Sequence, residues 1–415
     1  MRLLIISQYF WPENFRINDL VTELVRRGHE VTVLTGKPNY PDGDVFPEFL
    51  EHPENFLTYK GASIIRVPIW ARGSSRLSLF LNYLSYAVSA ALFGLFHLRD
   101  QQFDAIFVFE PSPVTVGLPA IILRRLKHSP VAFWVLDQWP ETLAAIGVVK
   151  SKVVLKLVGL LVAFIYARCD LVLAQSKSLV SMIGKYCNDP ERICYFPSWD
   201  DSGDVENYVI PAAEVPVMDG SFNILFAGNI GEAQDFSAIL DAAELLIDHK
   251  NIRWLIVGDG RMASWVKGEA ARRGLQENFV LLGRYPVDRM PSFYQHADGL
   301  LVSLKSDPVF SMTLPGKIQS YLAAGIPILG MLDGEGASVI QDSRAGFACP
   351  AGDSRALAEA VLCLSRLTDV ERQSMGQRGA AYSRREFDRG ILISRLETWL
   401  MNLSYKCVKK KGSAT

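Results

Sequence analysis

Cysteine and histidine are scarce in this chain of 415 residues, which contains six of each. The cysteines show no CxxC spacing and stand singly in apolar or helical stretches, at Cys169, Cys187, Cys194, Cys349, Cys363 and Cys407. This scatter argues against a disulfide framework and indicates thiols in a reducing compartment. The histidines form no ligand-spaced cluster with Asp or Glu, so we expect neither a metal ion nor another cofactor.

An excess of basic charge is also missing, because the formal net charge is −1. Proteins that bind a phosphate backbone usually carry a clear basic excess, so nucleic acid is not expected as a partner. Hydrophobic residues make up 49% and charged residues 21%, as in a globular rather than a disordered chain. The chain opens on the strand-like segment Leu3–Ile6 and no signal peptide is expected, which favours the cytoplasm.

A repeating β/α pattern predicts two α/β domains, since 415 residues exceed one ordinary core. Leu3–Ser7 is typical of a buried parallel strand, Ile17–Arg27 of an amphipathic helix that ends at Gly28, and Val31–Thr35 of the next strand. This unit is the βαβ crossover of a Rossmann-like sheet. Further strands of the first domain, residues 1–200, are predicted at Ser63–Val67, Ala105–Phe109, Val131–Leu136 and Leu171–Ala174.

A second β/α series begins after residues 201–220, whose Asp, Gly, Pro and Ser content predicts a linker. The second domain spans 221–385, with strands predicted at Phe222–Phe226, Arg253–Val257, Val280–Leu282, Gly299–Val302 and Pro327–Leu329. A helix at 386–405 is expected to return to the first domain, and the basic tail 406–415 to be frayed. Such sheets bind ligands at the carboxyl ends of their strands, so two facing Rossmann-like domains with an interdomain cleft are expected.

Two very apolar segments need a separate explanation. Leu77–Leu98 contains no Asp, Glu, Lys or Arg and is long enough to span a bilayer. We reject a spanning helix, because strands on both sides of the segment are needed in one sheet. We expect a helix at the membrane surface, peripheral on the inner face of the cytoplasmic membrane, with Val153–Ala167 as a second contact. The alternatives are that both helices are buried or form a dimer contact.

Three glycine-containing segments of the second domain are typical of an anion site. Gly228–Gly231 directly follows the first strand of this domain, and Gly258–Arg261 follows the next. Glycines at such turns let backbone N–H groups approach a phosphate, and let a base or ribose lie against the backbone. Pro315 and Gly316 then begin a helix whose first turn carries Lys317, which is unfavourable beside the helix dipole unless the lysine faces an anion. The alternatives are ordinary turns and a solvated lysine.

Two loops of the first domain combine aromatic rings with carboxylates. The loop Ser7–Asn14 contains three aromatic residues beside Glu13 and Asn14, and the loop Asp137–Glu141 follows a later strand at the same edge of the sheet. Aromatic rings next to hydrogen-bond acceptors suit a sugar, which has apolar faces and many hydroxyl groups. The alternative for Asp137 is a carboxylate that caps or braces its loop.

Taken in order, these motifs resemble the retaining glycosyltransferases of family 4, which have the GT-B fold. The resemblance covers almost the whole chain and is carried by Pro12–Asn14, Arg26–Thr35, Leu136–Thr142, Gly228–Gly231, Val257–Gly260 and Pro315–Pro327. It is closest to the branch that builds bacterial O-antigen, capsule and colanic-acid-type polysaccharides, including N-acetyl-L-fucosamine transferases. None of the motifs identifies the sugar.

The resemblance implies transfer from a nucleoside diphosphate-sugar, with UDP as the expected nucleotide, to a polyprenyl-diphosphate-linked saccharide. The anomeric configuration would be retained by front-side attack, in which the leaving phosphate helps to take the acceptor proton. Catalytic roles are expected for Asp137, Lys317 and Glu13, and acceptor contacts for Asn14, Trp139 and Glu141. Donor contacts are expected at Gly228, Asn229, Gly231, Gly258, Gly260, Arg261, Arg284, Leu314, Pro315, Gly316 and Lys317.

The sequence departs from the family pattern at several of these positions. Asn229 stands where many members have Arg, and Gln234–Asp235 lies near the place of a lysine. Met312 and Ser320 occupy the places of two glutamates, and the usual histidine of the first-domain loop is absent, with Asp137 nearby. The lysine at the helix start and the backbone amides would therefore supply more of the diphosphate binding.

Two other functions stay open. A nucleotide-sugar 2-epimerase would use a similar cleft, but it needs acid and base side chains around the donor sugar, and the second domain offers no convincing set. A non-catalytic subunit of a glycosyltransferase complex is compatible with the missing family residues. A nicotinamide dehydrogenase is disfavoured, because Ser7–Asn14 lacks the glycine fingerprint expected after the first strand.

Overall fold

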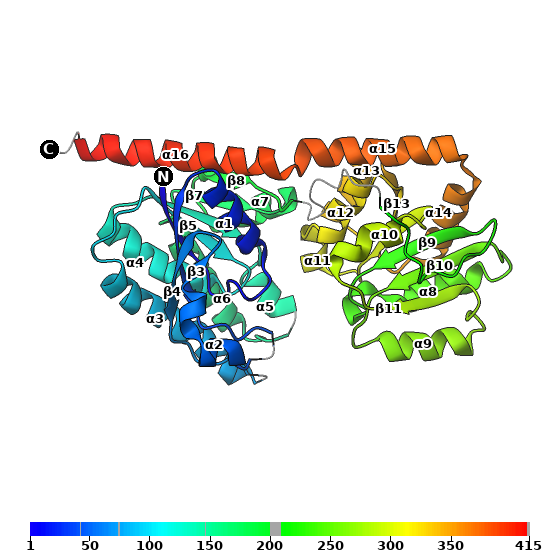
Figure 1. The fold of residues 1–415 in the computed structure, drawn as a ribbon, viewed down its shortest axis with the longest axis horizontal. Coiled ribbons are helices and arrows are strands. Elements are labelled where there is room, and N and C mark those ends of the chain that lie inside the picture. The colour runs from blue at the N-terminus through cyan, green and yellow to red at the C-terminus, as the bar shows by residue number, and fades with distance from the viewer. Residues whose placement is uncertain (42, 74, 146, 200–208, 413–415) are drawn as a thin grey trace. The chain divides into compact units, whose positions relative to one another are not determined.

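The computed structural model describes residues 1–412 except 42, 74, 146 and 200–208. The chain forms two compact units, drawn in Figure 1. The first comprises Met1–Pro197 and the C-terminal segment from Gly390, and the second comprises Ser198–Arg389. Each unit is described by itself below.

The first unit contains an eight-stranded sheet in the order β3-β4-β2-β1-β5-β6-β7-β8. All neighbouring strands are parallel except β3 and β4. The strands are β1 (Arg2–Ile6), β2 (Glu30–Gly36), β3 (Thr58–Tyr59), β4 (Ala62–Val67), β5 (Ala105–Glu110), β6 (Val131–Val135), β7 (Leu171–Ala174) and β8 (Ile193–Tyr195). Strands β5, β6 and β7 are buried throughout, as expected of a parallel sheet with helices on both faces.

The helices of the first unit follow the predicted β/α alternation (Figure 1). They are α1 (Arg16–Arg26), α2 (Pro47–Glu51), α3 (Arg76–His97), α4 (Gly117–Lys127), α5 (Glu141–Ala145), α6 (Lys152–Tyr166), α7 (Lys177–Ile183) and α16 (Arg389–Gly412). Helix α1 forms because Ile17, Leu20, Val21 and Leu24 lie on one stripe, which is completely buried.

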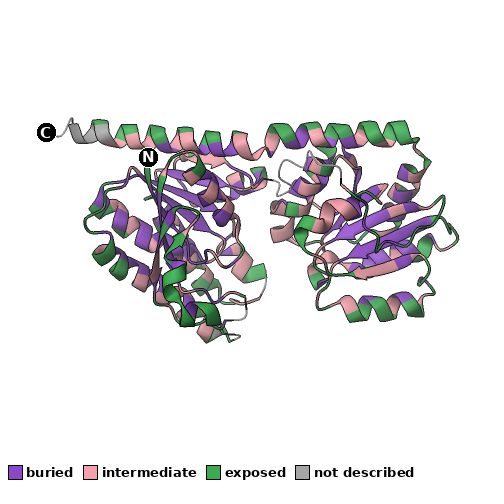
Figure 2. Ribbon diagram, viewed as in Figure 1, coloured by how far each residue is buried: buried purple, intermediate pink, exposed green. Residues whose placement is uncertain are grey.

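The second unit contains a six-stranded sheet with the order β11-β10-β9-β12-β13-β14, in which all neighbouring strands are parallel. The strands are β9 (Phe222–Ala227), β10 (Ile252–Val257), β11 (Phe279–Gly283), β12 (Gly299–Ser303), β13 (Ile328–Met331) and β14 (Gly346–Cys349). The helices are α8 (Phe236–Leu245), α9 (Ala263–Arg272), α10 (Met290–Tyr294), α11 (Pro308–Met312), α12 (Gly316–Ala324), α13 (Glu335–Ser343), α14 (Ser354–Arg366) and α15 (Asp369–Glu386). Figure 2 shows the buried sheet inside each unit.

The described part of the predicted linker, residues 209–220, packs as part of the second unit. Ala212 and Val215 are buried in its core, and the N–H of Ala212 donates to the carbonyl of Ser292 at 3.0 Å. The guanidinium of Arg253 donates to the carbonyl of Pro216 at 2.8 Å. This stretch therefore packs and hydrogen-bonds to the second unit. Its Pro and Gly content reflects an irregular backbone rather than an unstructured linker.

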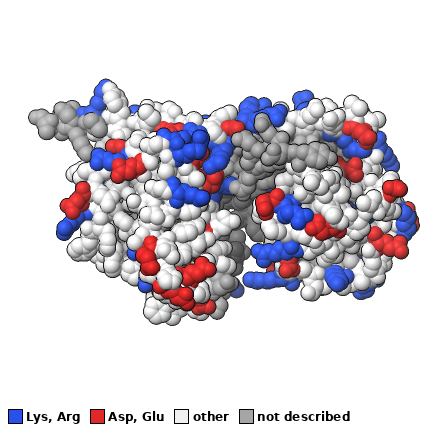
Figure 3. All heavy atoms as spheres, in the orientation of Figure 1, with Lys and Arg blue, Asp and Glu red and all other residues white. Residues whose placement is uncertain are grey.

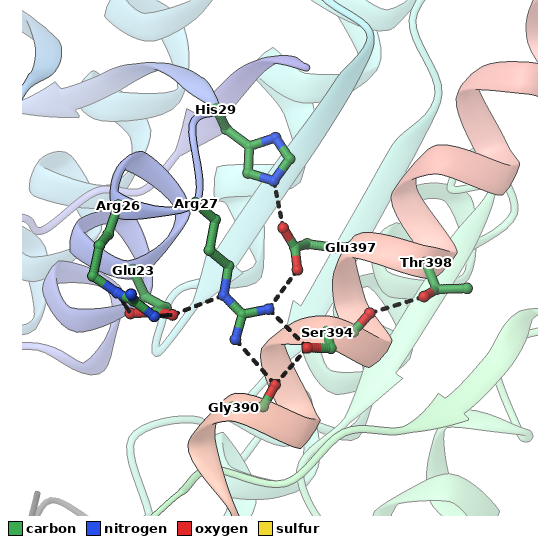
Figure 4. A network of polar contacts seen from close by, with 8 residues as sticks. All are labelled: Glu23, Arg26, Arg27, His29, Gly390, Ser394, Glu397 and Thr398. Atoms are coloured by element: carbon green, nitrogen blue, oxygen red, sulfur yellow. Dashed lines mark hydrogen bonds and ion pairs between the residues drawn. The ribbon is translucent and has the colours of Figure 1, made fainter. Parts of the chain in front are cut away.

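Helix α16 is fixed to the first unit by a polar network, drawn in Figure 4. Glu397 accepts a hydrogen bond from Arg27 at 2.5 Å and forms a 2.6 Å contact with Nε2 of His29. Arg27 also donates to the hydroxyl of Ser394 and to the carbonyl of Gly390. The same helix also has a buried apolar face, formed by Leu392, Ile393, Leu396 and Leu400. This face packs in the core, and the hydrogen bonds orient the helix.

Candidate functional site

Lys317 lies in the first turn of α12, where the sequence places it against the helix dipole. Pro315 caps this helix in an extended conformation, and Gly325 ends it with a left-handed φ of 69°. The Lys317 Nζ lies 3.5 Å from the centre of the Phe226 ring, and burial lowers the pKa of the amine to about 7. Within the described residues, no carboxylate forms an ion pair with Lys317. The arrangement is a poorly solvated cation that an anion would stabilise.

Gly228 makes room for this lysine. A Cβ at position 228 would lie 2.7 Å from the Nζ of Lys317 and 2.5 Å from its Cε, so any side chain there would displace the amine. Gly258 is required for a different reason, because a Cβ there would lie 1.8 Å from the carbonyl oxygen of Gly228. Both residues also have φ values above 140°, which favour glycine. The two predicted glycine turns are therefore packed directly against each other beside Lys317.

The backbone amides of Gly228–Gly231 are mostly engaged within the protein, which corrects the prediction that they bind the diphosphate. The N–H of Gly228 donates to Val257, that of Ile230 to Asp259, and that of Gly231 to the side chain of Gln234. Among the described contacts of this turn, only the N–H of Asn229 has no acceptor. The turn serves mainly to shape the surroundings of the lysine.

The first turn of α12 supplies other backbone donors. The N–H of Ile318 bonds to the carbonyl of Pro315 at 2.9 Å. In the described part of the chain, the N–H groups of Gly316 and Lys317 have no protein acceptor, as is usual for the first residues of a helix. Together with the amine of Lys317, they form a small group of donors at a positive helix end, which suits a phosphate.

The other predicted donor residues divide into exposed and buried positions. Arg261 and Arg284 are exposed and follow β10 and β11, at the carboxyl edge of the sheet. The side chain of Leu314 is buried in the core of the second unit, and a donor contact of this residue stays a prediction. Gly260 packs against the turn of Gly228–Gly231, because a Cβ at this position would lie 2.4 Å from the carbonyl of Ile230.

Glu13 braces loops of the first unit, and this changes its predicted catalytic role. Its carboxylate is buried and accepts three backbone N–H bonds, from Phe10 at 3.0 Å and from Asn39 and Tyr40 at 2.8 Å. Burial raises the pKa of Glu13, and the three bonds act in the opposite direction. The side chain joins the loops after β1 and β2, while the neighbouring Asn14 is exposed and accessible to a ligand.

Asp137 and Trp139 are in direct contact. The indole Nε1 of Trp139 donates to Oδ2 of Asp137 at 3.1 Å, and the N–H of Gln138 donates to Oδ1 at 2.8 Å. The Trp139 ring also forms an edge contact with the ring of Tyr83, with centroids 6.1 Å apart. A half-buried carboxylate beside two aromatic rings can accept a hydroxyl proton or a hydrogen bond while a sugar ring packs alongside.

Glu141 is the third predicted acceptor residue, and a tyrosine holds it. It begins α5, and its Oε1 accepts a hydrogen bond from the hydroxyl of Tyr186 at 2.8 Å. The other oxygen, Oε2, is buried without a partner among the described residues. Glu141 therefore lies close to Asp137 in the chain, but its side chain is held by Tyr186 in the segment after α7.

Sequence reasoning missed Glu110 and Tyr83 in the same region. Glu110 ends β5 and is fully buried, with its Oε2 3.4 Å from the N–H of Asp137. The signal was available, because Glu110 is the one charged residue in the apolar strand Ala105–Glu110. Tyr83 was assigned only to the apolar segment Leu77–Leu98, since helical spacing does not reveal which side faces the loops.

Helix α3 carries a continuous exposed apolar stripe. Six side chains at helical spacing are 43–73% exposed, namely Leu77, Phe80, Leu84, Val88, Leu92 and Phe96. The opposite side packs on the unit, where the hydroxyl of Tyr86 donates to the carbonyl of Leu34 and Asn82 is buried. By length and composition alone, Leu77–His97 could cross a membrane, and 28% of it is buried in the protein. Figure 2 shows both sides of α3, the exposed one in green.

Helix α6 carries a second stripe of the same kind. Val153, Leu157, Leu160 and Phe164 are 42–70% exposed and recur at helical spacing. The exposed Lys152 lies next to this stripe, and Lys156 lies one turn further along the helix. Elsewhere on the face drawn in Figure 3, basic and acidic residues are interspersed, apart from an acidic group around α2.

No group of three or more His, Cys, Asp or Glu residues that could hold a metal ion occurs in the described ranges. The same ranges contain six free cysteines, three of them buried, so thiol chemistry has no evident place in the site.

Both halves of the chain are similar to known glycosyl transferases. A family model described as glycosyl transferase 4-like domain matches residues 14–199, and one described as glycosyl transferases group 1 matches residues 221–366. The chain is 27% identical to WbjE of Pseudomonas aeruginosa, named a probable glycosyltransferase, over 64% of this chain and 70% of that one. It is 26% identical to WcaI of Escherichia coli K12, whose name describes a colanic acid biosynthesis glycosyl transferase, over 78% and 82% of the two chains.

A solved structure of HepE from Anabaena in complex with UDP and glucose has a TM-score of 0.66 to this chain. It covers 97% of this chain and 100% of that one at 12% identity, so the likeness concerns the fold. With the two parallel sheets described above, it confirms the predicted α/β fold of two Rossmann-like domains, the GT-B type.

Proposed function

Because the chain belongs to the glycosyltransferase group 1 family, we propose that it moves a sugar from a UDP-linked donor to a lipid-linked saccharide. The product is a bacterial surface polysaccharide precursor, and the anomeric configuration of the sugar is retained. The name of WcaI supports the polysaccharide assignment, and the complex of HepE with UDP supports the nucleotide.

The observation that carries the proposal is the position of Lys317. The half-buried amine of Lys317 has no carboxylate partner in the described residues, and it lies 3.5 Å from an aromatic ring and in the first turn of α12. Such a group is costly unless a ligand supplies the negative charge. A nucleoside diphosphate has this charge, and the free N–H groups of Gly316 and Lys317 give it directional donors.

In the transfer, negative charge develops on the diphosphate as the bond between sugar and phosphate breaks. The amine of Lys317 and the N–H groups of the first turn of α12 stabilise this charge, and the stabilisation is largest at the transition state. The exposed Arg261 and Arg284 lie at the same strand edge and hold the rest of the nucleotide. No covalent intermediate is needed, because the leaving phosphate itself takes up the acceptor proton.

The acceptor hydroxyl is placed by the first unit. Asp137 accepts a hydrogen bond from the attacking hydroxyl, and the ring of Trp139 packs against a face of the sugar. Asn14 is exposed at the neighbouring loop and contributes a polar contact. Glu13 acts indirectly by bracing that loop through its three N–H bonds.

The lipid of the acceptor accounts for the exposed stripes of α3 and α6. An apolar surface of this length on a soluble unit is costly in water and suits the membrane interface. Lys152 and Lys156 lie on the same helix as the stripe of α6 and can meet anionic headgroups, each worth about 1 kcal/mol close to the surface. The protein is therefore cytoplasmic and peripheral, bound to the inner face of the membrane in which the polyprenyl chain lies.

Thermal stabilisation by a panel of nucleotides and nucleotide sugars tests the donor assignment. A ligand that binds only the folded state raises the apparent stability, so UDP and one or more UDP-sugars are expected to raise Tm. Lys317→Met is expected to lose this response, whereas Lys267→Met on α9, the matched control, keeps it. An equal response of wild type and Lys317→Met removes Lys317 from the donor site.

A further inference from the structure

Glu110 is a buried acid at the carboxyl end of β5. It is 0% exposed and pairs in the ladder with Val135 of β6. Its Oε2 accepts the N–H of Asp137 at 3.4 Å, a long hydrogen bond, and its Oε1 is buried without a partner in the described part of the chain. A carboxylate in this position would leave charge uncompensated on one oxygen, which is unfavourable in a buried site.

The groups that face Glu110 do not offset a negative charge. They are Asp137 from the loop after β6, Tyr83 from α3 and Tyr166 from α6, and none of these is a cation. Burial raises the pKa of Glu110 well above its usual range, and the nearby charge of Asp137 raises it further. Burial also raises the pKa of both tyrosines, which therefore stay neutral near pH 7.

Glu13 is a second buried acid of the same unit, and it is much better hydrogen-bonded than Glu110. It accepts three backbone N–H bonds of 2.8–3.0 Å and lies near the guanidinium of Arg66. The Glu110 carboxyl group accepts one long N–H bond, from Asp137, and the N–H of Leu136, which donates to the backbone carbonyl of Glu110, also lowers its pKa. No cation acts on Glu110 among the described residues. The two acids are therefore expected to differ in protonation, although both are buried.

Buried polar atoms without a partner are concentrated around Glu110. Six buried side-chain polar atoms that lack a partner in the described residues belong to the last residue of β5 and to the connections after β5 and β6. They are on Glu110, Thr115, Gln138, Glu141 and Thr142. Buried polar atoms are normally paired, so such a concentration is expected at a functional rather than a purely structural position.

We propose that Glu110 is a positioning residue that stays protonated at neutral pH, so that no buried charge beside the loop after β6 displaces Asp137. Asp137 is half-buried and accepts N–H bonds from Gln138 and Trp139, whereas Glu110 is fully buried with one carboxyl oxygen unpaired in the described part of the chain. Acids with such different surroundings can take different roles in one site. The position of Asp137 toward an acceptor rests on the proposed function, whereas the protonation of Glu110 does not.

Infrared spectroscopy of the full-length protein tests the protonation directly. At about pH 8 the wild type is expected to show the C=O stretch of a neutral carboxylic acid, since the burial and the like charge keep the proton on Glu110. Glu110→Gln is expected to lose this band, and Glu13→Gln, the control, to keep it. A wild-type spectrum without the band, or an equal band in Glu110→Gln, overturns the proposal.

The pH profile of transfer tests the positioning role. When Glu110 ionises at alkaline pH, it repels Asp137 and shifts the loop, so kcat at saturating donor falls. The amide in Glu110→Gln cannot ionise, and the alkaline loss of kcat is therefore expected to disappear in this variant, while KM for the donor keeps its own pH dependence. An unchanged alkaline limb contradicts the role. Absence of transfer in every variant, with the band present, counts against the proposed function and not against the protonation of Glu110.

Discussion

If Lys317 binds the donor diphosphate as proposed, its amine makes donor binding depend on pH. Burial lowers the pKa of its amine to about 7, and a bound diphosphate raises this pKa, because an anion favours the charged form. At about pH 8 the free protein therefore carries a largely neutral amine, and binding of UDP takes up a proton. Calorimetric titration in two buffers of different ionisation enthalpy measures this uptake.

We expect the proton uptake to vanish in Lys317→Met, together with a loss of affinity of about 10- to 100-fold, the worth of a hydrogen bond to a charged group. In the wild type, affinity falls as the pH rises above the pKa of the free amine. The same uptake in Lys317→Met would assign the proton to another group.

Helix α3 permits a test of membrane binding at the scale of one element. Its stripe is exposed on the folded unit, so apolar residues there can be replaced without opening the core. We expect the wild type to float with anionic liposomes at low salt, and Phe80→Ser/Leu84→Ser to remain in the soluble fraction. Leu245→Ser/Val287→Ser replaces exposed residues of the second unit and is expected to float like the wild type. Wild-type protein that stays soluble contradicts the docking.

Helix α16 depends on Glu397 for its orientation on the first unit. Burial raises the pKa of Glu397, but hydrogen bonds and charge from His29 and Arg27 lower it by more, and the net pKa is below the usual value. A carboxylate with a lowered folded pKa stabilises the protein above its unfolded pKa, and this stabilisation is lost as the pH falls through the folded pKa.

Glu397→Gln is accordingly expected to lower the free energy of unfolding by about 2 kcal/mol at neutral pH and by less at acid pH. Urea denaturation measures the difference. Asp100→Asn, at a position 86% exposed, is the control and is expected to change stability by less than about 0.5 kcal/mol. An equal effect of Glu397→Gln at neutral and acid pH would show that packing, not the ion pair, matters.

At the scale of the whole molecule, the sequence predicts the elements better than the roles of individual side chains. The long buried strands and the turn at Gly228 follow from apolar runs and glycine positions, whereas β3 and β8 are too short for any periodicity to appear. The bracing role of Glu13 depends on N–H groups of Asn39 and Tyr40, which are distant in sequence. The burial of Leu314 and the engaged amides of Gly228–Gly231 likewise depend on tertiary packing.

Metal dependence is a second property of the whole molecule. The described residues contain no cluster of His, Cys, Asp or Glu suited to a metal ion, and Lys317 is the cation of the proposed donor site. We therefore expect transfer to continue unchanged in EDTA. Complete loss of transfer in EDTA, with recovery on addition of a divalent cation, would contradict this expectation.

The most direct test of the account is the transfer reaction itself. Purified protein is incubated with radiolabelled nucleotide sugars and a polyprenyl-diphosphate-linked saccharide, and the anomeric configuration of the product is determined by NMR. We expect a UDP-sugar to label the acceptor with retention, and both Asp137→Asn and Lys317→Met to lower kcat/KM by about 100-fold or more. A protein that binds UDP but transfers no sugar, or that only interconverts the free nucleotide sugars, would contradict it.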